Sequence, residues 1–423
     1  MPAATRRIED GVAAAHVEKA PRHLVVIGNG MAAVRVLEEL LALAPKAYHI
    51  TVFGAEPHPG YNRILLSSVL AGESSFEQIV TRDAAWYQSR GIVLKLGVRV
   101  TAINRARRMV IAADGSHTPY DRLLLATGSQ PLVPPLPGAD LAGVISYRDI
   151  DDTQTMIDAA TRTREAVVIG GGLLGLEAAN GLARRGMRVT VIHLMPWLME
   201  RQLDAPAAAM LQASLAARGI RFLLGMQTRE ILGYGGAVRG VRLVDGRELA
   251  ADLVVFAVGI RPNIELARRT GLACERGVQV TDTMQTFDPR VYAVGECVAH
   301  RGVSYGLVAP LYDMARVCAQ HLAGVGAFAY SGSVTATRLK VTGVEVFSAG
   351  DFTGGPDSES IVYADAPAHV YRKLVLRGGR LAGAVMVGDA HDAAWYQELI
   401  ASGSDVAAMR GRLVFGRALA QAA

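Results

Sequence analysis

Two glycine-rich turns carry the clearest chemical signal in this sequence. The first reads GNGMAA from residue 28 and stands between the apolar run Leu24 to Ile27 and a helix-like stretch. Glycines in this pattern permit a tight turn and let backbone amides approach a pyrophosphate at the start of a helix, where the dipole favours negative charge. We therefore predict a dinucleotide site whose residues include Gly28, Gly30, Met31 and Ala32.

The second turn reads GGGLLG from residue 170 and completes the G-x-G-x-x-G pattern in the same context, after the run Val167 to Ile169. Two such units in one chain indicate two bound dinucleotides. The residues that we expect to contact the second dinucleotide are Gly170, Gly172, Leu174 and Gly175.

Each unit continues into a second apolar run, and the residues after those runs bear on ribose recognition. Glu56 follows the run Ile50 to Phe53 and can accept hydrogen bonds from ribose hydroxyls. In the second unit the matching place holds His193, where an acid would bind the 2′-hydroxyl of NAD. His193 indicates relaxed or NADPH-leaning selectivity, with help from Arg201; the alternative is a solvated loop histidine.

Other buried apolar runs end in small residues and glycines, at places where we expect the bound cofactor to lie close to the backbone. We expect contacts from Ala126, Thr127, Gly128, Gly259, Gly295 and Glu296. Pro310 fits the N1 position of a helix, whose amide end could stabilise negative charge on a bound group.

The elements around these turns predict an α/β protein. Continuous apolar runs joined by helical stretches are typical of parallel strands buried on both faces. This pattern starts at Arg22 and again at Ala166. From about Ser331 strands and turns alternate, which indicates a C-terminal α+β domain. We predict a flexible tail (1–21), a first nucleotide-binding domain (22–131 and 264–330), a second (132–263) and the C-terminal domain (331–423).

Composition excludes several classes of protein. The net charge of +5 is spread along 423 residues, so we expect no nucleic-acid partner. The N-terminal segment lacks an apolar core, so we expect neither a signal peptide nor a membrane span. The three cysteines have no metal-binding spacing, so we expect no metal site and a reducing, cytoplasmic location.

The order of GNGMAA, ATGS, GGGLLGLEAA, AVGIRPN and AVGEC resembles the flavoprotein family with two dinucleotide folds that includes rubredoxin, ferredoxin and glutathione reductases. Longer strings, such as HITVFGAEPHPGYNRILLSSVLAGE, resemble the flavoprotein portion of the assimilatory NAD(P)H nitrite reductase large subunit. The resemblance runs from about Leu24 to Val387. It implies a glutathione-reductase-like fold in which the first unit binds FAD, with Glu296 among its contacts, and the second binds NADH or NADPH.

Departures from the family narrow the chemistry. The chain has no cysteine before Cys274, so a thiol relay near the flavin is not expected. Ferredoxin reductases carry a lysine where Ser68 falls, which leaves Arg63 as the nearby cation. We therefore expect Arg63 and Glu296 to tune the flavin. The sequence also lacks the clustered cysteines of an iron–sulfur and sirohaem region, so we expect that this chain alone does not reduce nitrite.

These features predict an enzyme that passes electrons from NAD(P)H through FAD to an external iron–sulfur, rubredoxin-like or nitrate/nitrite reductase protein. The leading hypothesis is the reductase component of a nitrite or nitrate assimilation system. A free-standing rubredoxin or ferredoxin reductase is the first alternative. A redox sensor that binds both cofactors without turnover is the second.

Overall fold

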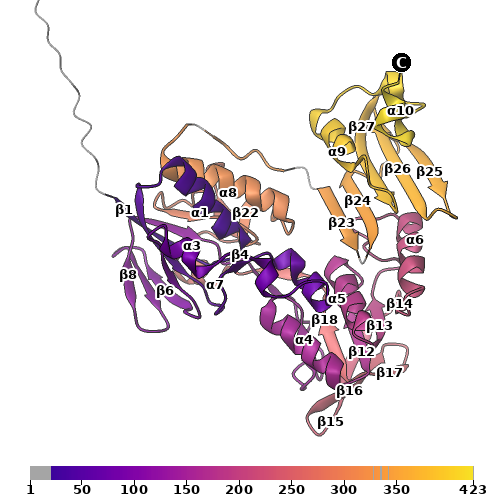
Figure 1. Ribbon diagram of the computed structural model, residues 1–423, viewed down its shortest axis with the longest axis horizontal. Helices are drawn as coiled ribbons and strands as arrows, with labels where there is room; N and C mark the ends of the chain where they lie inside the picture. The colour runs from indigo at the N-terminus through magenta and orange to yellow at the C-terminus, as the bar shows by residue number, and fades with distance from the viewer. Residues whose placement is uncertain (1–20, 327, 334–335, 342, 423) are drawn as a thin grey trace, which may run out of the picture.

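Three sheets organise the chain in the computed structural model, which describes residues 21–326, 328–333, 336–341 and 343–422 (Figure 1). The tail predicted over residues 1–21 lies, apart from residue 21, outside the described residues. The first two sheets are parallel and the third is antiparallel.

The first sheet consists of β1 (Arg22–Ile27), β2 (Tyr48–Phe53), β5 (Val93–Lys95), β9 (Arg122–Leu125) and β21 (Val291–Ala293). Its order is β21-β9-β1-β2-β5, and every neighbouring pair is parallel. Consecutive residues of β1 are buried, so both faces of this strand are covered, as its unalternated apolar run predicts. Helices α1 (Met31–Leu43) and α8 (Val308–Ala323) run side by side, although they are far apart in sequence (Figure 1).

Smaller elements surround this sheet. An antiparallel meander contains β6 (Val100–Asn104), β7 (Met109–Ala112) and β8 (His117–Pro119). Two-stranded pairs are formed by β3 (Gly60–Tyr61) with β4 (Val80–Arg82), and by β20 (Val278–Val280) with β22 (Val298–His300). The short helices are α2 (Leu66–Leu70), α3 (Ala84–Gln88), α7 (Glu265–Arg269) and the 3₁₀ turns Arg63–Leu65 and Glu77–Ile79.

The second sheet repeats the parallel design. Its strands are β11 (Val144–Ser146), β12 (Glu165–Ile169), β13 (Arg188–His193), β14 (Arg221–Leu224) and β18 (Leu253–Phe256), in the order β11-β18-β12-β13-β14. Its helices are α4 (Ile150–Arg162), α5 (Leu173–Arg184) and α6 (Ala205–Ala216). An antiparallel layer of β15 (Thr228–Tyr234), β16 (Ala237–Leu243) and β17 (Glu248–Ala250) shares an apolar core with the sheet.

Several contacts tie the first parallel unit to the second. Strand β10 (Ser129–Pro131) pairs antiparallel with β19 (Ile260–Pro262) where the chain crosses between them. Helix α2 packs on α5 so tightly that a Cβ on Gly181 would lie 2.5 Å from Leu70 Cγ. Arg185 then donates to the carbonyl oxygens of Val69, at 3.0 Å, and of Leu70. The two units therefore meet through close helix packing rather than a loose linker.

The third sheet is antiparallel, and its central strands are buried on both faces. Its strands are β23 (Ala336–Val341), β24 (Val344–Gly350), β25 (Glu359–Asp365), β26 (Val370–Arg377) and β27 (Arg380–Val387), in the order β23-β24-β27-β26-β25. One face packs on α9 (Ala393–Ser402), beside the 3₁₀ turns Ala407–Met409 and Leu413–Phe415 and α10 (Arg417–Ala420). The other face joins the core that contains α6, and Figure 1 shows this neighbourhood.

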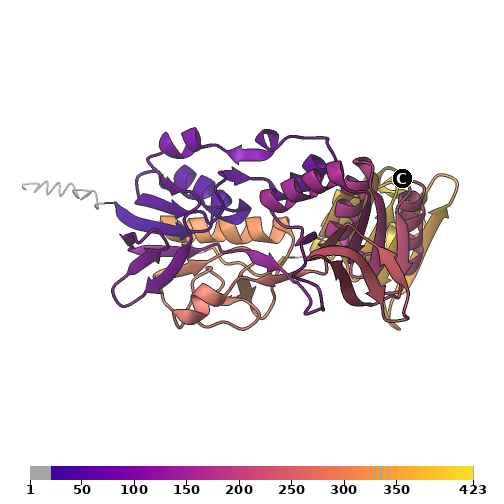
Figure 2. The same ribbon diagram turned by 90° about the horizontal axis from the view of Figure 1, so that it is seen from below.

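The predicted α/β class, with two parallel nucleotide-binding-type sheets and a C-terminal sheet domain, is confirmed. The exact domain boundaries stay a prediction. Figure 2 shows the same arrangement from a second side, with the first parallel unit at one end of the molecule and the other two sheets at the opposite end. None of the helices in the described segments is long and apolar enough to cross a bilayer.

Candidate functional site

The first glycine turn links β1 to α1 and forms an open cradle at the helix start. Gly28 has φ +108°, and a Cβ there would lie 2.1 Å from the carbonyl oxygen of Ala126. Gly30 precedes α1 as its N-cap, and a Cβ on it would meet nothing within 4 Å. No side chain caps this helix start. The first-turn amides, which include those of Met31 and Ala32, are therefore placed to donate hydrogen bonds to an anion.

The second turn, between β12 and α5, has the same geometry. Gly170 has φ +121°, and a Cβ there would lie 2.3 Å from the carbonyl oxygen of Ala257. Gly172 caps α5 with φ −79° and ψ −179°, nearly identical to the −80° and −179° of Gly30. A Cβ on Gly175 would lie 2.0 Å from the carbonyl oxygen of Gly170, so this position requires glycine for the close approach of helix and turn. Leu174 lies between them in the first turn of α5.

The strand ends gather around these turns. Gly295 lies against the start of α1, because a Cβ on it would be 3.2 Å from the Cβ of Ala32. Thr127 donates from Oγ1 to the carbonyl oxygen of Asn263 at 2.7 Å. Gly128 and Gly259 both have positive φ and open space where a Cβ would stand. These predicted residues therefore line the ends of the parallel strands, which is where nucleotides bind in open α/β sheets.

Glu56 and Arg63 form a charged pair beside the first turn. Arg63 Nη2 donates to Glu56 Oε1 at 2.6 Å, and the Tyr61 hydroxyl donates to Glu56 Oε2 at 2.6 Å. Burial acts to raise the pKa of Glu56, but the charge of Arg63 and both hydrogen bonds outweigh it and leave that pKa lowered. Glu56 is thus a fixed carboxylate whose remaining lone pairs can accept from ribose hydroxyls.

Glu296 lies in a second charged pair that the sequence did not predict. Its Oε2 accepts from the Ser129 hydroxyl at 2.8 Å and from the guanidinium of Arg148. Arg63 Nη1 donates to the backbone carbonyl oxygen of Arg148 at 2.8 Å, so the two pairs form one network. Arg148 Nε is buried without a hydrogen-bond partner, which leaves a donor available at this point. Ser129 was within the quoted ATGS string, whereas no spacing pattern singled out Arg148.

Pro310 lies in the first turn of α8 but not at the predicted position. The helix begins at Val308 with Leu307 as its N-cap, so Pro310 is the third helical residue rather than the first. The N1 prediction is therefore wrong. The position still tolerates proline because the first amides of a helix have no intrahelical acceptor. The start of α8 carries no side-chain cap.

His193 ends β13 with its ring turned inward. Only 8% of the residue is exposed, so the alternative of a solvated loop histidine is wrong. Its Nδ1 accepts from the backbone N–H of Gly171 at 3.1 Å, and its Nε2 lies 3.1 Å from Glu200 Oε2. Arg201, the predicted helper, is 85% exposed. Glu200 was missed because it follows the strand by seven residues and is brought back by folding.

The three cysteines of the chain are unpaired. Cys297 and Cys318 are buried, Cys274 is partly exposed, and none forms a disulfide. Burial raises the pKa of the thiols of all three. Across the residues that the structure describes, no group of three or more His, Cys, Asp or Glu is arranged to hold a metal ion.

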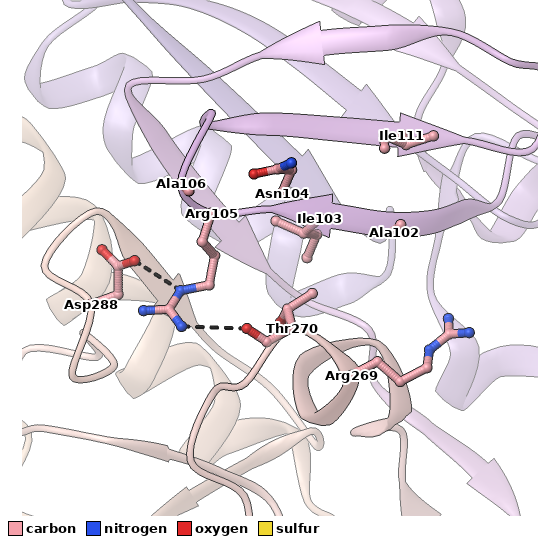
Figure 3. A pocket seen from close by; sticks show the side chains of 9 residues that line it. All are labelled: Ala102, Ile103, Asn104, Arg105, Ala106, Ile111, Arg269, Thr270 and Asp288. Atoms are coloured by element: carbon pink, nitrogen blue, oxygen red, sulfur yellow. Dashed lines mark hydrogen bonds and ion pairs between the residues drawn. The ribbon is translucent and has the colours of Figure 1, made fainter.

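A large surface groove lies elsewhere, between the β6–β7 meander and α7 (Figure 3). Its polar lining is already paired, since Arg105 contacts Asp288 at 3.0 Å and the carbonyl oxygen of Thr270 at 3.3 Å. The groove includes none of the predicted nucleotide-binding residues.

Comparison with known proteins decides the family. The pyridine nucleotide-disulphide oxidoreductase family matches residues 22–321. The chain belongs to this family. The rubredoxin NAD⁺ reductase C-terminal domain matches residues 336–404, which lie within the predicted C-terminal domain.

Relatives of this family member share most of its length. The nitrite reductase [NAD(P)H] of Bacillus subtilis is 51% identical over 371 residues, which are 88% of this chain and 46% of the relative. The assimilatory nitrate reductase electron transfer subunit of the same organism is 45% identical over 88% of this chain and 48% of the relative. The rubredoxin-NAD⁺ reductase of Pseudomonas putida is 32% identical over 68% and 75%. The chain spans about half the length of the first two.

Solved structures agree with the fold. A ferredoxin reductase from Rhodopseudomonas palustris has a TM-score of 0.82 at 27% identity, covering 88% of this chain and 93% of its own. Putidaredoxin reductase, in its covalent complex with putidaredoxin, has a TM-score of 0.83 at 28% identity, covering 91% and 94%. The chain is thus an oxidoreductase of a family that binds FAD and NAD(P)H. Its two open, uncapped glycine turns fit two such dinucleotides.

Proposed function

We propose that this chain takes electrons from NADH or NADPH, passes them through FAD and delivers them to an external redox protein. The acceptor proposed is an iron–sulfur, rubredoxin-like or nitrate/nitrite reductase protein in a nitrite or nitrate assimilation system. The names of the two Bacillus relatives support a role in such a system, and both relatives align over 88% of the chain.

One observation carries the proposal: two glycine turns of matching geometry end strands of two different parallel sheets, and a charged network lies beside the first. Gly30 and Gly172 have backbone angles within 1° of each other. The network runs from Glu56 through Arg63 and Arg148 to Glu296. This arrangement favours two dinucleotides bound to one polypeptide.

We assign roles to the residues on this basis. The turn at Gly28 and Gly30, with Met31 and Ala32, holds the FAD pyrophosphate, and Glu56 accepts from its ribose. Glu296, the strand-end residues Ala126, Thr127, Gly128 and Gly295, and the α8 start at Pro310 complete the FAD site. The nicotinamide dinucleotide is held by Gly170, Gly172, Leu174, Gly175 and Gly259, near His193.

The bound cofactors supply the hydride chemistry, from nicotinamide to flavin. The protein supplies orientation and electrostatics. Arg63 is positively charged, because a guanidinium keeps its proton in proteins, and its 2.6 Å contact with Glu56 Oε1 holds that charge in place. A fixed cation in this network favours negative charge on a reduced group beside it. No side-chain acid or nucleophile is required for this transfer.

An external acceptor is proposed because the chain offers no internal thiol route. The family name refers to disulphide chemistry, but this sequence has no cysteine before Cys274. The burial of Cys297 and Cys318 keeps both as thiols packed in the core. Stopped-flow mixing of the NADH-reduced protein with a co-encoded nitrate or nitrite reductase tests the proposal. Rapid reoxidation supports the assimilation role, whereas rapid reoxidation by rubredoxin alone overturns that role in favour of a free-standing rubredoxin reductase.

A rubredoxin or ferredoxin reductase is the second candidate, favoured by the C-terminal match over residues 336–404. A third candidate, a redox sensor without turnover, predicts slow reduction of every artificial acceptor, whereas an enzyme reduces ferricyanide rapidly.

We also propose a cytoplasmic location, which the three unpaired cysteines support.

A further inference from the structure

We propose that Glu200, positioned by His193, makes the second nucleotide site selective for NADH over NADPH. The inference rests on the proposed function, because it takes the turn at Gly170 as the site of the nicotinamide dinucleotide. The Glu200 carboxylate recognises the adenine ribose and rejects a 2′-phosphate.

His193 connects the glycine turn to Glu200 through both ring nitrogens. Because Nδ1 accepts from Gly171 N–H at 3.1 Å, the neutral ring carries its proton on Nε2. That N–H then points at Glu200 Oε2, 3.1 Å away. The ring is nearly fully buried, so its orientation is set by these two contacts. The imidazole therefore holds a carboxylate at a fixed place beside the turn.

The segment after β13 folds back onto the same turn. Met199 N–H donates to the carbonyl oxygen of Gly171 at 3.0 Å, so both backbone groups of Gly171 are bonded to this region. A Cβ on Gly171 would lie 2.7 Å from Leu198 Cδ2 and 2.8 Å from His193 Cγ, so these side chains leave no space for a side chain at Gly171. Glu200 follows Met199 directly. It thus lies at the carboxyl end of β13, where Rossmann-type folds place the acid that binds the ribose.

A carboxylate at this place distinguishes the two cofactors by charge. It accepts a hydrogen bond from a 2′-hydroxyl, and it repels a 2′-phosphate. Two like charges a few ångströms apart repel more strongly near a protein surface than in bulk water, because the effective dielectric constant is lower there. The side chain of Glu200 is only 24% exposed, which favours the stronger of these two repulsions.

Among the described residues, Arg201 is the arginine that contacts Glu200 and could attract a 2′-phosphate, but its position weakens that attraction. Its Nε lies 3.9 Å from Glu200 Oε1, and the side chain is almost entirely in solvent. Exposed charges are screened and contribute little, whereas the partly buried carboxylate is held by His193. The balance therefore favours NADH, in contrast to the relaxed or NADPH-leaning selectivity expected from the sequence.

Binding of NAD⁺ and NADP⁺ to the oxidised, FAD-loaded protein, measured by isothermal titration calorimetry, tests this without turnover. We expect the wild-type protein to bind NAD⁺ at least about tenfold more tightly than NADP⁺. Glu200→Gln should reduce that ratio by about tenfold, mainly by improving NADP⁺ binding. The matched control is Glu265→Gln, which removes an exposed carboxylate on α7 and should leave the ratio unchanged.

Two further variants separate positioning from folding. His193→Asn keeps an acceptor near Nδ1 for Gly171 but loses the contact to Glu200, so the NAD⁺ to NADP⁺ ratio should fall. His193→Gln keeps a donor toward Glu200, so the ratio should be better preserved. A wild-type ratio in Glu200→Gln, or tighter NADP⁺ binding by the wild-type protein, overturns the inference alone. A protein that binds neither nucleotide overturns the proposed function as well.

Discussion

Arg63 donates from Nη1 to the backbone carbonyl oxygen of Arg148 at 2.8 Å, across 85 residues of sequence. This bond joins the pair formed by Arg63 and Glu56 to the pair formed by Arg148 and Glu296. The first pair belongs to the segment after β2, and Arg148 precedes α4 in the second unit. The network therefore couples the two parallel units at the proposed flavin site.

Arg148→Gln should loosen FAD and destabilise the protein by about 1–3 kcal/mol, because it leaves Glu296 partly buried without its cation. Chemical denaturation and the FAD retained after gel filtration measure the two effects. Arg188→Gln is the matched control, since it removes an exposed arginine that pairs with Glu165 at the surface. Equal stability and FAD content for Arg148→Gln and the control would contradict this role.

Gly28→Ala and Gly30→Ala should fail in different ways. At Gly28 a Cβ would clash with Ala126 and the positive φ would be strained, so the turn itself should be disrupted. At Gly30 the backbone is extended and the Cβ enters open space, so the protein should fold and yet bind FAD more weakly. Thermal unfolding and FAD content distinguish these outcomes. Full FAD content in Gly30→Ala would mean that this space is not the pyrophosphate site.

Glu177 in α5 predicts a pH dependence of stability. Burial raises the pKa of this carboxyl to about 7, and the nearby Ser67 hydroxyl acts in the lowering direction. An acid whose folded-state pKa is raised retains its proton in the fold after the unfolded chain has lost it. The free energy of unfolding should therefore fall as pH rises from about 4.5 to about 7.

Glu177→Gln should remove much of that slope and stabilise the protein at pH 8 by about 3 kcal/mol, because the amide stays neutral. Urea denaturation of both proteins at several pH values provides the comparison. Parallel pH profiles for the variant and the wild type would show that Glu177 ionises normally in the fold.

Asp204 is predicted to anchor the C-terminal sheet. It caps α6 by accepting from Ala207 N–H at 3.2 Å, and it accepts from the Tyr371 hydroxyl of β26 at 2.8 Å. Asp204→Ala should lower stability by about 1–2 kcal/mol through loss of the cap and should increase proteolysis between the sheets. Tyr371→Phe removes only the contact between the sheets and should show the proteolysis with less loss of stability. If Asp204→Ala resists protease like the wild type, the anchor is unimportant.

The strands and glycine turns could be predicted because their signals are local. Continuous apolar runs identified β1 and β13, and the glycine spacing located the starts of α1 and α5. The start of α8 was predicted at Pro310, two residues too late, because Leu307 offers no capping side chain to mark the true start at Val308.

The side-chain network could not be predicted because its contacts are long-range. Arg148 and Glu296 are 148 residues apart, and no spacing rule relates them. Similarly, His193 could be placed at a strand end, but its orientation depends on Gly171 and on a segment that folds back to bring Glu200 beside it. The sequence pattern therefore predicts helices and strands, whereas the contacts between distant side chains depend on tertiary packing.

The most direct measurement is an anaerobic titration of the purified protein with NADH, followed by its visible absorption spectrum. The account predicts a yellow protein that releases FAD on denaturation and is bleached by about one equivalent of NADH, consistent with two-electron transfer between bound cofactors. A colourless protein that takes up no FAD on reconstitution, or a flavin that NADH does not reduce, would contradict it.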